Sequence, residues 1–170
     1  PPPPGAAPPA WSGLRFFNVY GPREQHKGGQ KSVLAHMYPR AARGEAVTLF
    51  RSHNPQYADG GQLRDFIYVR DCVDVVEWLL TGERSGGLLN VGTGKARSFA
   101  ELAGALFAAL ERKPDIRYVD TPEEIRAKYQ YYTQADMTRL RDLGYDRQFT
   151  TIEEGARDYV LNWLDAGAAK

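Results

Sequence analysis

The 170-residue sequence predicts an α/β fold, and three observations support this fold class. Short apolar segments rich in aromatic and β-branched residues alternate with longer segments of helical periodicity. Hydrophobic residues make up 42% of the chain and charged residues 25%, as in an ordinary globular domain. Six of the 11 prolines lie in the first nine residues, a segment that cannot pack a core. We therefore expect a Pro-rich disordered or linker segment over residues 1–13, and one α/β unit with a largely parallel sheet over residues 14–170.

Five segments have the composition of β-strands. The first ends at Gly21-Pro22, a dipeptide that interrupts strands, and the second is followed by a polar loop over Ser52–Gln62. Helical segments separate the strands, which favours parallel pairing. The predicted strands are Leu14–Tyr20, Val47–Arg51, Arg64–Val69, Leu88–Val91 and Ile116–Val119.

Two helices are predicted in the first half of the chain. The first spans about Gln30 to Arg43 and is closed by Gly44, and Pro39 is expected to kink or shorten it. The second is expected to be capped by Asp71. Its periodicity predicts one buried face, made of Val73, Val76, Leu79 and Leu80.

Start signals mark further helices in the second half. Ser98–Glu101 and Thr151–Glu154 both have the spacing of a capping box. Thr121–Glu124 places a proline near a helix start, and Met137–Leu143 precedes a glycine that stops a short helix. The last helix is expected to bury Ala156, Tyr159, Val160, Trp163 and Leu164.

Charge and cysteine content exclude several classes of protein. Lys and Arg number 22 against 21 Asp and Glu, so the net charge of +1 gives no basic surface for nucleic acid or for an acidic membrane. The single cysteine, Cys72, excludes a disulfide framework and a Cys-based zinc site. His26, His36 and His53 match no local metal-binding spacing, so we expect no metal. No apolar stretch approaches the roughly 20 residues of a membrane span.

Polar side chains gather after the first predicted strand. Asn18–Gly28 brings Asn, Arg, Glu, His and Lys to the carboxyl end of that strand. Ligands of open α/β sheets bind at this end, which favours a site over a merely solvated turn.

Three other motifs leave alternatives open. Arg64 could clamp a phosphate, pair with Asp65 or cap a neighbouring helix. Gly92–Lys95 resembles a phosphate loop but lacks the following Ser or Thr and the earlier glycine, so a tight turn is favoured. In Lys128–Tyr132, adjacent tyrosines cannot both face one core, and stacking on a base or sugar competes with partial burial.

Three segments resemble hallmarks of the extended short-chain dehydrogenase/reductases that act on nucleotide sugars. These are Leu14–Glu24, Arg64–Val73 and Asn90–Gly94. Two more segments, Glu24–Gly28 and Lys128–Asp136, are similar to the narrower group of ADP-glyceromanno-heptose 6-epimerases. The resemblance extends over nearly all of the chain.

The resemblance implies the carboxyl-terminal, substrate-binding part of an extended Rossmann-type enzyme. Such enzymes use NADP to oxidise ADP-heptose at C6 and return the hydride to the opposite face, which yields a precursor of the lipopolysaccharide core. The family resembled is cytoplasmic and homo-oligomeric (a pentamer), and we expect neither nucleic acid nor a membrane as a partner.

The resemblance also implies roles for individual residues. Lys27 matches a position with an acid/base role, which requires burial or a nearby cation to lower the pKa of a lysine toward neutrality. Val19 matches a backbone contact to the cofactor, and Arg64 would hold the pyrophosphate. The full set of matched substrate-binding positions is Asn18, Gly29, His36, Phe50, Arg51, Ser52, His53, Arg64 and Tyr129.

Two features of that family are not in this sequence. No glycine-rich dinucleotide fingerprint occurs, and none of the ten tyrosines has a lysine four positions later. We therefore expect the nucleotide-binding half and the catalytic tyrosine to be absent, and the isolated chain to be inactive and prone to self-association. A non-catalytic module that binds nucleotide sugars, or another nucleotide-sugar epimerase or dehydratase, remains an alternative.

Overall fold

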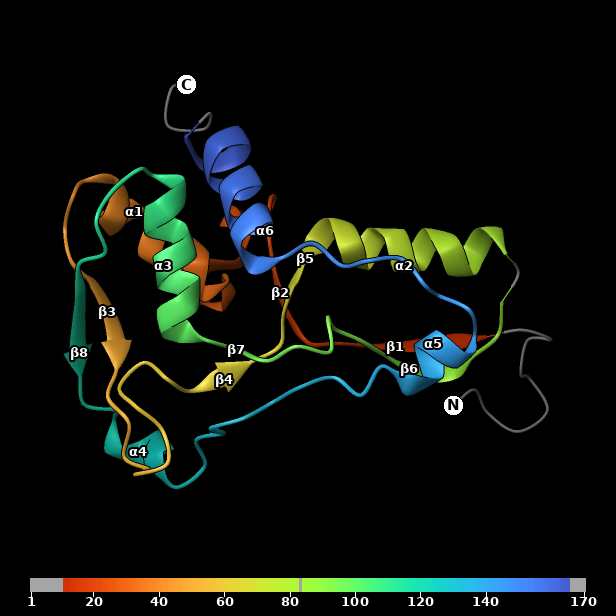
Figure 1. Ribbon diagram of the computed structural model, residues 1–170, viewed down its shortest axis with the longest axis horizontal. Coiled ribbons are helices and arrows are strands. Elements are labelled where there is room, and N and C mark those ends of the chain that lie inside the picture. The colour runs from red at the N-terminus through yellow and green to blue at the C-terminus, as the bar shows by residue number, and fades with distance from the viewer. Residues whose placement is uncertain (1–10, 83, 166–170) are drawn as a thin grey trace.

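The structure, a computed structural model, describes residues 11–82 and 84–165 and has the predicted α/β organisation (Figure 1). Most of the predicted 1–13 linker lies outside the described residues, and Ser12 and Gly13 open the first strand. The strands are β1 (Ser12–Phe16), β2 (Asn18–Tyr20), β3 (Val47–Phe50), β4 (Leu63–Arg64), β5 (Phe66–Tyr68), β6 (Gly87–Val91), β7 (Arg97–Ser98) and β8 (Ile116–Val119). The α-helices are α1 (Val33–Ala42), α2 (Val69–Thr81), α3 (Phe99–Ala109), α4 (Glu123–Arg126), α5 (Thr138–Asp142) and α6 (Ile152–Tyr159). A 3₁₀ helix, η1 (Gln25–Gln30), and a π-helix, η2 (Val160–Leu164), complete the elements.

The described strands pair two by two instead of forming the expected continuous sheet. The pairs β1–β6, β2–β5 and β3–β8 are parallel, as predicted, whereas β4–β7 is antiparallel. The first predicted strand changes partner at Phe17. The Phe17 N–H donates to the Val91 carbonyl (3.0 Å), and the next N–H, of Asn18, donates to the Asp65 carbonyl (3.0 Å). The chain thus passes from the β6 side to the β5 side within one residue.

Asp65 interrupts the predicted strand Arg64–Val69. Its side chain is fully buried, with 0% exposure. One carboxylate oxygen accepts hydrogen bonds from the Thr93 N–H (2.8 Å) and hydroxyl (2.7 Å), and the other accepts from the N–H groups of Gly94 (2.9 Å) and Ala135 (3.0 Å). The segment divides here into β4, which pairs with β7, and β5, which pairs with β2, and Val69 begins α2.

The Gly92–Gly94 segment is a tight turn wrapped around the Asp65 carboxylate. A Cβ on Gly92 would lie 2.5 Å from the Ala135 Cβ and 2.8 Å from an Asp65 oxygen, and Gly94 adopts φ +74°. Only glycine fits both constraints. A phosphate loop would offer its backbone N–H groups to a ligand. Here the N–H groups of Thr93 and Gly94 donate to Asp65 instead, so the turn resembles a phosphate loop without having N–H groups available to a phosphate.

Two apolar cores lie on either side of this junction. In one, α1, α3 and α6 pack with β3 and β8, and Figure 1 shows these helices gathered at one end of the molecule. In the other, α2 and α5 cover the β1–β6 pair. The second cluster comprises Ile67, Cys72, Val75, Trp78, Leu79, Leu89, Val91, Leu140 and Tyr145. No described helix is long and apolar enough to span a bilayer.

The predicted buried face of α2 is wrong in part. Leu79 is buried, but Val73 is 60% and Leu80 73% exposed. Asp71 lies in the first turn instead of capping the helix, and its carboxylate accepts hydrogen bonds from the N–H (2.9 Å) and hydroxyl (2.8 Å) of Thr150. The described residues therefore leave part of the apolar surface of α2 uncovered.

Pro39 does not end helix α1, although the sequence predicts that it kinks or shortens this helix. Helix α1 continues from Val33 to Ala42 through this proline, whose side chain is exposed. A proline removes a single helical N–H donor, and the packing of Leu34, Met37 and Ala41 in the core is sufficient to keep the helix continuous. Gly44, with φ +76°, follows the helix end as predicted.

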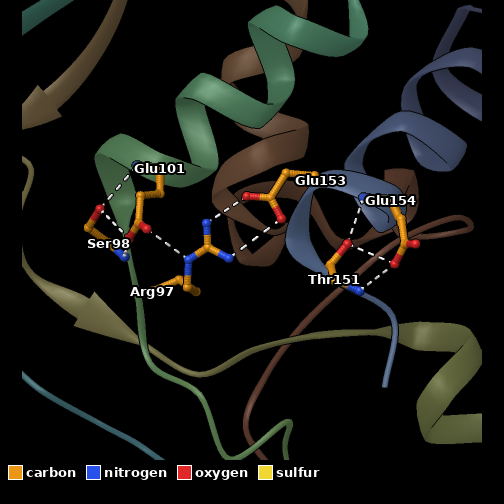
Figure 2. Close-up of polar contacts among 6 residues, drawn as sticks. All are labelled: Arg97, Ser98, Glu101, Thr151, Glu153 and Glu154. Carbon is orange, nitrogen blue, oxygen red and sulfur yellow. Dashed lines mark hydrogen bonds and ion pairs between the residues drawn. The ribbon is translucent and has the colours of Figure 1, made fainter. Parts of the chain in front are cut away.

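Both predicted capping boxes are present, and one arginine joins them (Figure 2). Ser98 and Glu101 cap α3, and Thr151 and Glu154 cap α6. Between them, the Arg97 guanidinium donates to Glu101 (2.8 Å) and, with a second nitrogen, to Glu153 (2.6 Å). One guanidinium therefore links a carboxylate in the first turn of α3 to a carboxylate in the first turn of α6.

The Asp65→Asn substitution is expected to destabilise the protein strongly. An amide keeps one acceptor oxygen but turns its own N–H₂ toward two buried N–H donors, so two hydrogen bonds are lost. The free energy of unfolding should fall by about 3 kcal/mol. Urea denaturation measures this, with the exposed Asp146→Asn as a matched control. Equal stabilities for the two variants would contradict the role given to Asp65.

Acid should weaken the link at Arg97. The hydrogen bonds from Arg97 lower the pKa of Glu153, and those from Ser98 and Arg97 outweigh burial to lower the pKa of Glu101. A lowered folded pKa stabilises the fold above the unfolded value of about 4.3, and this contribution is lost as the pH falls further. In melts recorded at falling pH, Glu153→Gln should lose less stability than the unmodified chain, whereas exposed Glu124→Gln should lose as much. If Glu153→Gln loses as much stability at low pH as the unmodified chain, the stabilising role of the link is refuted.

Candidate functional site

A cavity of about 390 Å³ lies between β3, β4 and the first turns of α1 and α3. Three of the predicted substrate-binding residues line it: Phe50, Arg64 and Tyr129. The other lining residues are mainly apolar. They are Val33, Thr48, Leu49, Gln62 and Phe99. The cavity is within the size range of small-ligand sites, and its single cation is placed among aromatic rings.

The Arg64 guanidinium is the charged group of this cavity. It lies 5.5 Å from the centre of the Tyr129 ring and 5.6 Å from that of Phe99, and it donates to the Leu63 carbonyl (2.8 Å). Burial lowers the pKa of Arg64, which nevertheless keeps its charge at neutral pH. Among the described residues no carboxylate forms an ion pair with it, because the neighbouring Asp65 side chain is bound elsewhere. Arg64 therefore has donors available for an anionic ligand.

The Arg51–His53 segment leaves the cavity at the end of β3. Gln62, which is buried, donates to the carbonyls of Phe50 (3.4 Å) and Arg51 (3.3 Å). The Thr121 hydroxyl donates to the Arg51 carbonyl (3.1 Å), and the Thr121 N–H donates to Nε2 of His53 (3.3 Å). The Ser52 hydroxyl donates to the Asn54 carbonyl (2.7 Å). These bonds fix the backbone of the segment and leave the Arg51 side chain exposed.

Tyrosines extend the cavity wall outward. Tyr131 pairs with β4 through its carbonyl, which accepts from the Leu63 N–H (2.8 Å), and this pairing brings Tyr129 over Arg64. Tyr129 contacts Phe50 edge to face, with ring centres 6.2 Å apart. Tyr131 is half-buried and Tyr132 is 52% exposed, as expected for adjacent residues on opposite sides.

The loop after β2 holds two further predicted residues and contacts a third. Lys27 and Gly29 lie exposed on η1, and the Nε2–H of His36, on α1, donates to the Gly29 carbonyl (3.2 Å). Gly21 starts the loop at φ +140°, where a Cβ would lie 2.5 Å from Val69. The described residues leave Lys27 exposed, so they do not supply the burial that its predicted role requires.

Asn18 and Val19 lie on β2, away from the lining of the cavity. Asn18 is exposed and Val19 half-buried, and both pair with β5. The described residues do not fit a bound dinucleotide. No glycine-rich fingerprint is present in the sequence, and the one loop of similar shape is filled by Asp65. No group of three or more His, Cys, Asp or Glu side chains within residues 11–82 and 84–165 could hold a metal.

Three residues of this site were not predicted from the sequence. Phe99 forms one wall, and Gln62 and Thr121 hold the backbone of the Arg51–His53 segment. The sequence indicates Phe99 only as part of a helix start. Gln62 ends a polar loop, and nothing in that pattern distinguishes a buried glutamine from a solvated one.

Known proteins are similar to this chain in sequence and in fold. A model of the NAD dependent epimerase/dehydratase family matches residues 10–92. The ADP-L-glycero-D-manno-heptose-6-epimerase of Nitratidesulfovibrio vulgaris strain DP4 is 51% identical over 153 residues, which is 90% of this chain and 47% of that protein. The chain thus spans about half the length of the curated relatives it matches.

Two solved structures are similar in fold over most of this chain. The ADP-L-glycero-D-manno-heptose-6-epimerase of Helicobacter pylori matches with a TM-score of 0.72 and 31% identity, over 90% of this chain and 44% of that one. The UDP-glucose 4-epimerase of Thermus thermophilus, in complex with NAD, matches with a TM-score of 0.70 and 30% identity, over 89% of this chain and 45% of that one. The chain is therefore homologous to the ADP-heptose 6-epimerases of the NAD dependent epimerase/dehydratase family, and it has the α/β fold of the extended short-chain dehydrogenase/reductases.

Proposed function

We propose that this chain binds the nucleotide-sugar substrate of an ADP-heptose 6-epimerase. The observation that supports this most directly is the half-buried Arg64, which pairs with no carboxylate in the described part of the chain and is set between aromatic rings in a cavity of about 390 Å³. A guanidinium binds a diphosphate with paired hydrogen bonds, and flat apolar walls accept a base or sugar. The 51% identity to an enzyme named for ADP-heptose favours that substrate over UDP sugars.

The whole reaction would invert C6 of ADP-heptose by oxidation and re-reduction with NADP, for lipopolysaccharide core synthesis in the cytoplasm. In that reaction Arg64 holds the diphosphate, Phe50 and Tyr129 enclose the ligand, and Arg51, Ser52 and His53 contact its exposed side. Asn18, Gly29 and His36 are further proposed substrate contacts, Lys27 an acid/base, and Val19 a backbone contact to the cofactor. No hydride-transfer step is assigned to these residues, since they form no dinucleotide site.

Calorimetric titration of this chain tests the substrate. ADP-heptose should bind more tightly than UDP-glucose, because the similarity in the Glu24–Gly28 and Lys128–Asp136 segments is to the heptose enzymes. Equal or tighter binding of UDP-glucose would overturn the heptose assignment in favour of another nucleotide-sugar epimerase or dehydratase.

Turnover separates an enzyme from a binding module. With ADP-heptose and NADP, the isolated chain should show no epimerisation and little NADP binding, because the sequence has no Tyr-x-x-x-Lys pair and no fingerprint. Measurable turnover would contradict this. If NADP binds tightly, the conclusion that the described residues lack a dinucleotide site is wrong.

Arg64→Lys should weaken binding of ADP-heptose by about tenfold or more, because an ammonium cannot form the paired hydrogen bonds of a guanidinium. Calorimetry measures the affinity, and circular dichroism checks the fold. Arg117→Lys, on the exposed face of β8, is the matched control and should bind as the unmodified chain does. Similar affinities for the two variants would place the diphosphate elsewhere.

We also propose that the chain self-associates. Exposed Val73 and Leu80 lie on α2, and Leu80 borders an apolar groove of about 280 Å³ formed with Trp11 and Leu14. Exposed apolar area of this kind promotes association. In sedimentation velocity, Leu80→Gln should shift the chain toward monomer, whereas Leu161→Gln, at an exposed leucine of η2, should not. A monomeric parent chain with a sharp cooperative melt would refute the proposal.

A further inference from the structure

A buried carboxylate closes the loop that contains Lys27. Glu24 is only 4% exposed. One of its oxygens accepts from the Ser32 N–H (2.6 Å), and the other accepts from the Ser32 hydroxyl (2.7 Å) and, more weakly, from the Gly21 N–H (3.5 Å). Both ends of the Gly21–Ser32 loop are thus fastened to one side chain.

The loop has little else to define its shape. The six residues of η1 contain no buried side chain, and Gly28, with φ +54° and ψ −122°, breaks the helical path. Arg23 also adopts a positive φ, of 67°. Within the loop, the Lys27 N–H donates to the Glu24 carbonyl (3.0 Å) and the Lys31 N–H donates weakly to the Gly28 carbonyl (3.5 Å). From α1, His36 donates to the Gly29 carbonyl at the tip of the loop (3.2 Å). Glu24 therefore bonds to the Lys27 backbone as well as to both loop ends.

If Glu24 only closed a surface turn, a neutral side chain could do so at a lower free-energy cost of burial. In the described part of the chain, no Lys, Arg or His forms an ion pair with Glu24. A buried carboxylate without a cation is stabilised only by its hydrogen bonds, and its burial costs free energy. The Tyr159 phenol is also buried beside it, and burial and the Glu24 charge together raise the pKa of Tyr159. A fixed loop geometry is the property that this arrangement provides.

We propose that Glu24 is a positioning residue for Lys27: by fastening Gly21 and Ser32 to one carboxylate, it holds the exposed 3₁₀ segment so that the Lys27 ammonium faces the bound nucleotide sugar. This inference rests on the proposed function, in which Lys27 is an acid/base. Glu24 itself does not line the cavity.

Hydrogen exchange tests the fastening without any ligand. In Glu24→Gln the amides of Lys27 and Ser32 should exchange about tenfold faster, while those of Leu102 and Leu106 in the core keep their rates. Ser32→Ala should act in the same direction, and Ser32→Thr, which keeps the hydroxyl, should restore slow exchange. Unchanged exchange at Lys27 in both Glu24→Gln and Ser32→Ala would overturn the proposal, and exposed Glu124→Gln serves as the control.

Lysine acylation tests the effect on Lys27. In the unmodified chain ADP-heptose should protect Lys27 from an N-hydroxysuccinimide ester, measured by mass spectrometry against exposed Lys113. In Glu24→Gln this protection should be lost, although calorimetry shows an affinity within about threefold of the parent. Retained protection would overturn the positioning role. If the parent chain binds no ADP-heptose, the proposed function fails instead, and the exchange rates still decide whether Glu24 fastens the loop.

Discussion

The Asp65 carboxylate is the interaction on which the rest of the structure depends. Its four hydrogen-bond donors come from Thr93, Gly94 and Ala135, and its backbone carbonyl accepts from Asn18. One residue therefore joins the β2–β5 pair, the turn after β6 and the segment that leads to α5. The next two residues, Phe66 and Ile67, belong to different apolar cores, so losing this junction would affect both cores.

The same residue determines the chemistry of the site. Successive side chains of an extended segment point to opposite sides, so the inward turn of Asp65 leaves Arg64 facing the cavity. Because the carboxylate is fully occupied by neutral donors, it does not neutralise the guanidinium beside it. The Arg64 guanidinium lies near the rings of Phe99 and Tyr129 and keeps N–H donors available. This arrangement suits a diphosphate.

The sequence predicted well what depends on local chemistry. The capping boxes at Ser98 and Thr151, the strand Ile116–Val119 and the turn at Gly92–Gly94 are all present. It failed where a long-range partner decides. Asp71 bonds to Thr150 instead of capping α2, and Asp65 divides a segment whose composition is that of one strand. Among site residues, Arg64, Phe50 and Tyr129 line one cavity, whereas Gln62 acts through contacts that no local pattern reveals.

Arg64 is available to an anion and the glycine turn is not, and a single titration tests this distinction. When the chain is titrated with ADP-heptose, nuclear magnetic resonance should show saturable chemical-shift changes at Arg64, Phe50, Phe99 and Tyr129. The amides of Thr93 and Gly94, which donate to Asp65, should keep their positions. Saturable shifts at Thr93 and Gly94 without shifts around Arg64 would contradict this distinction.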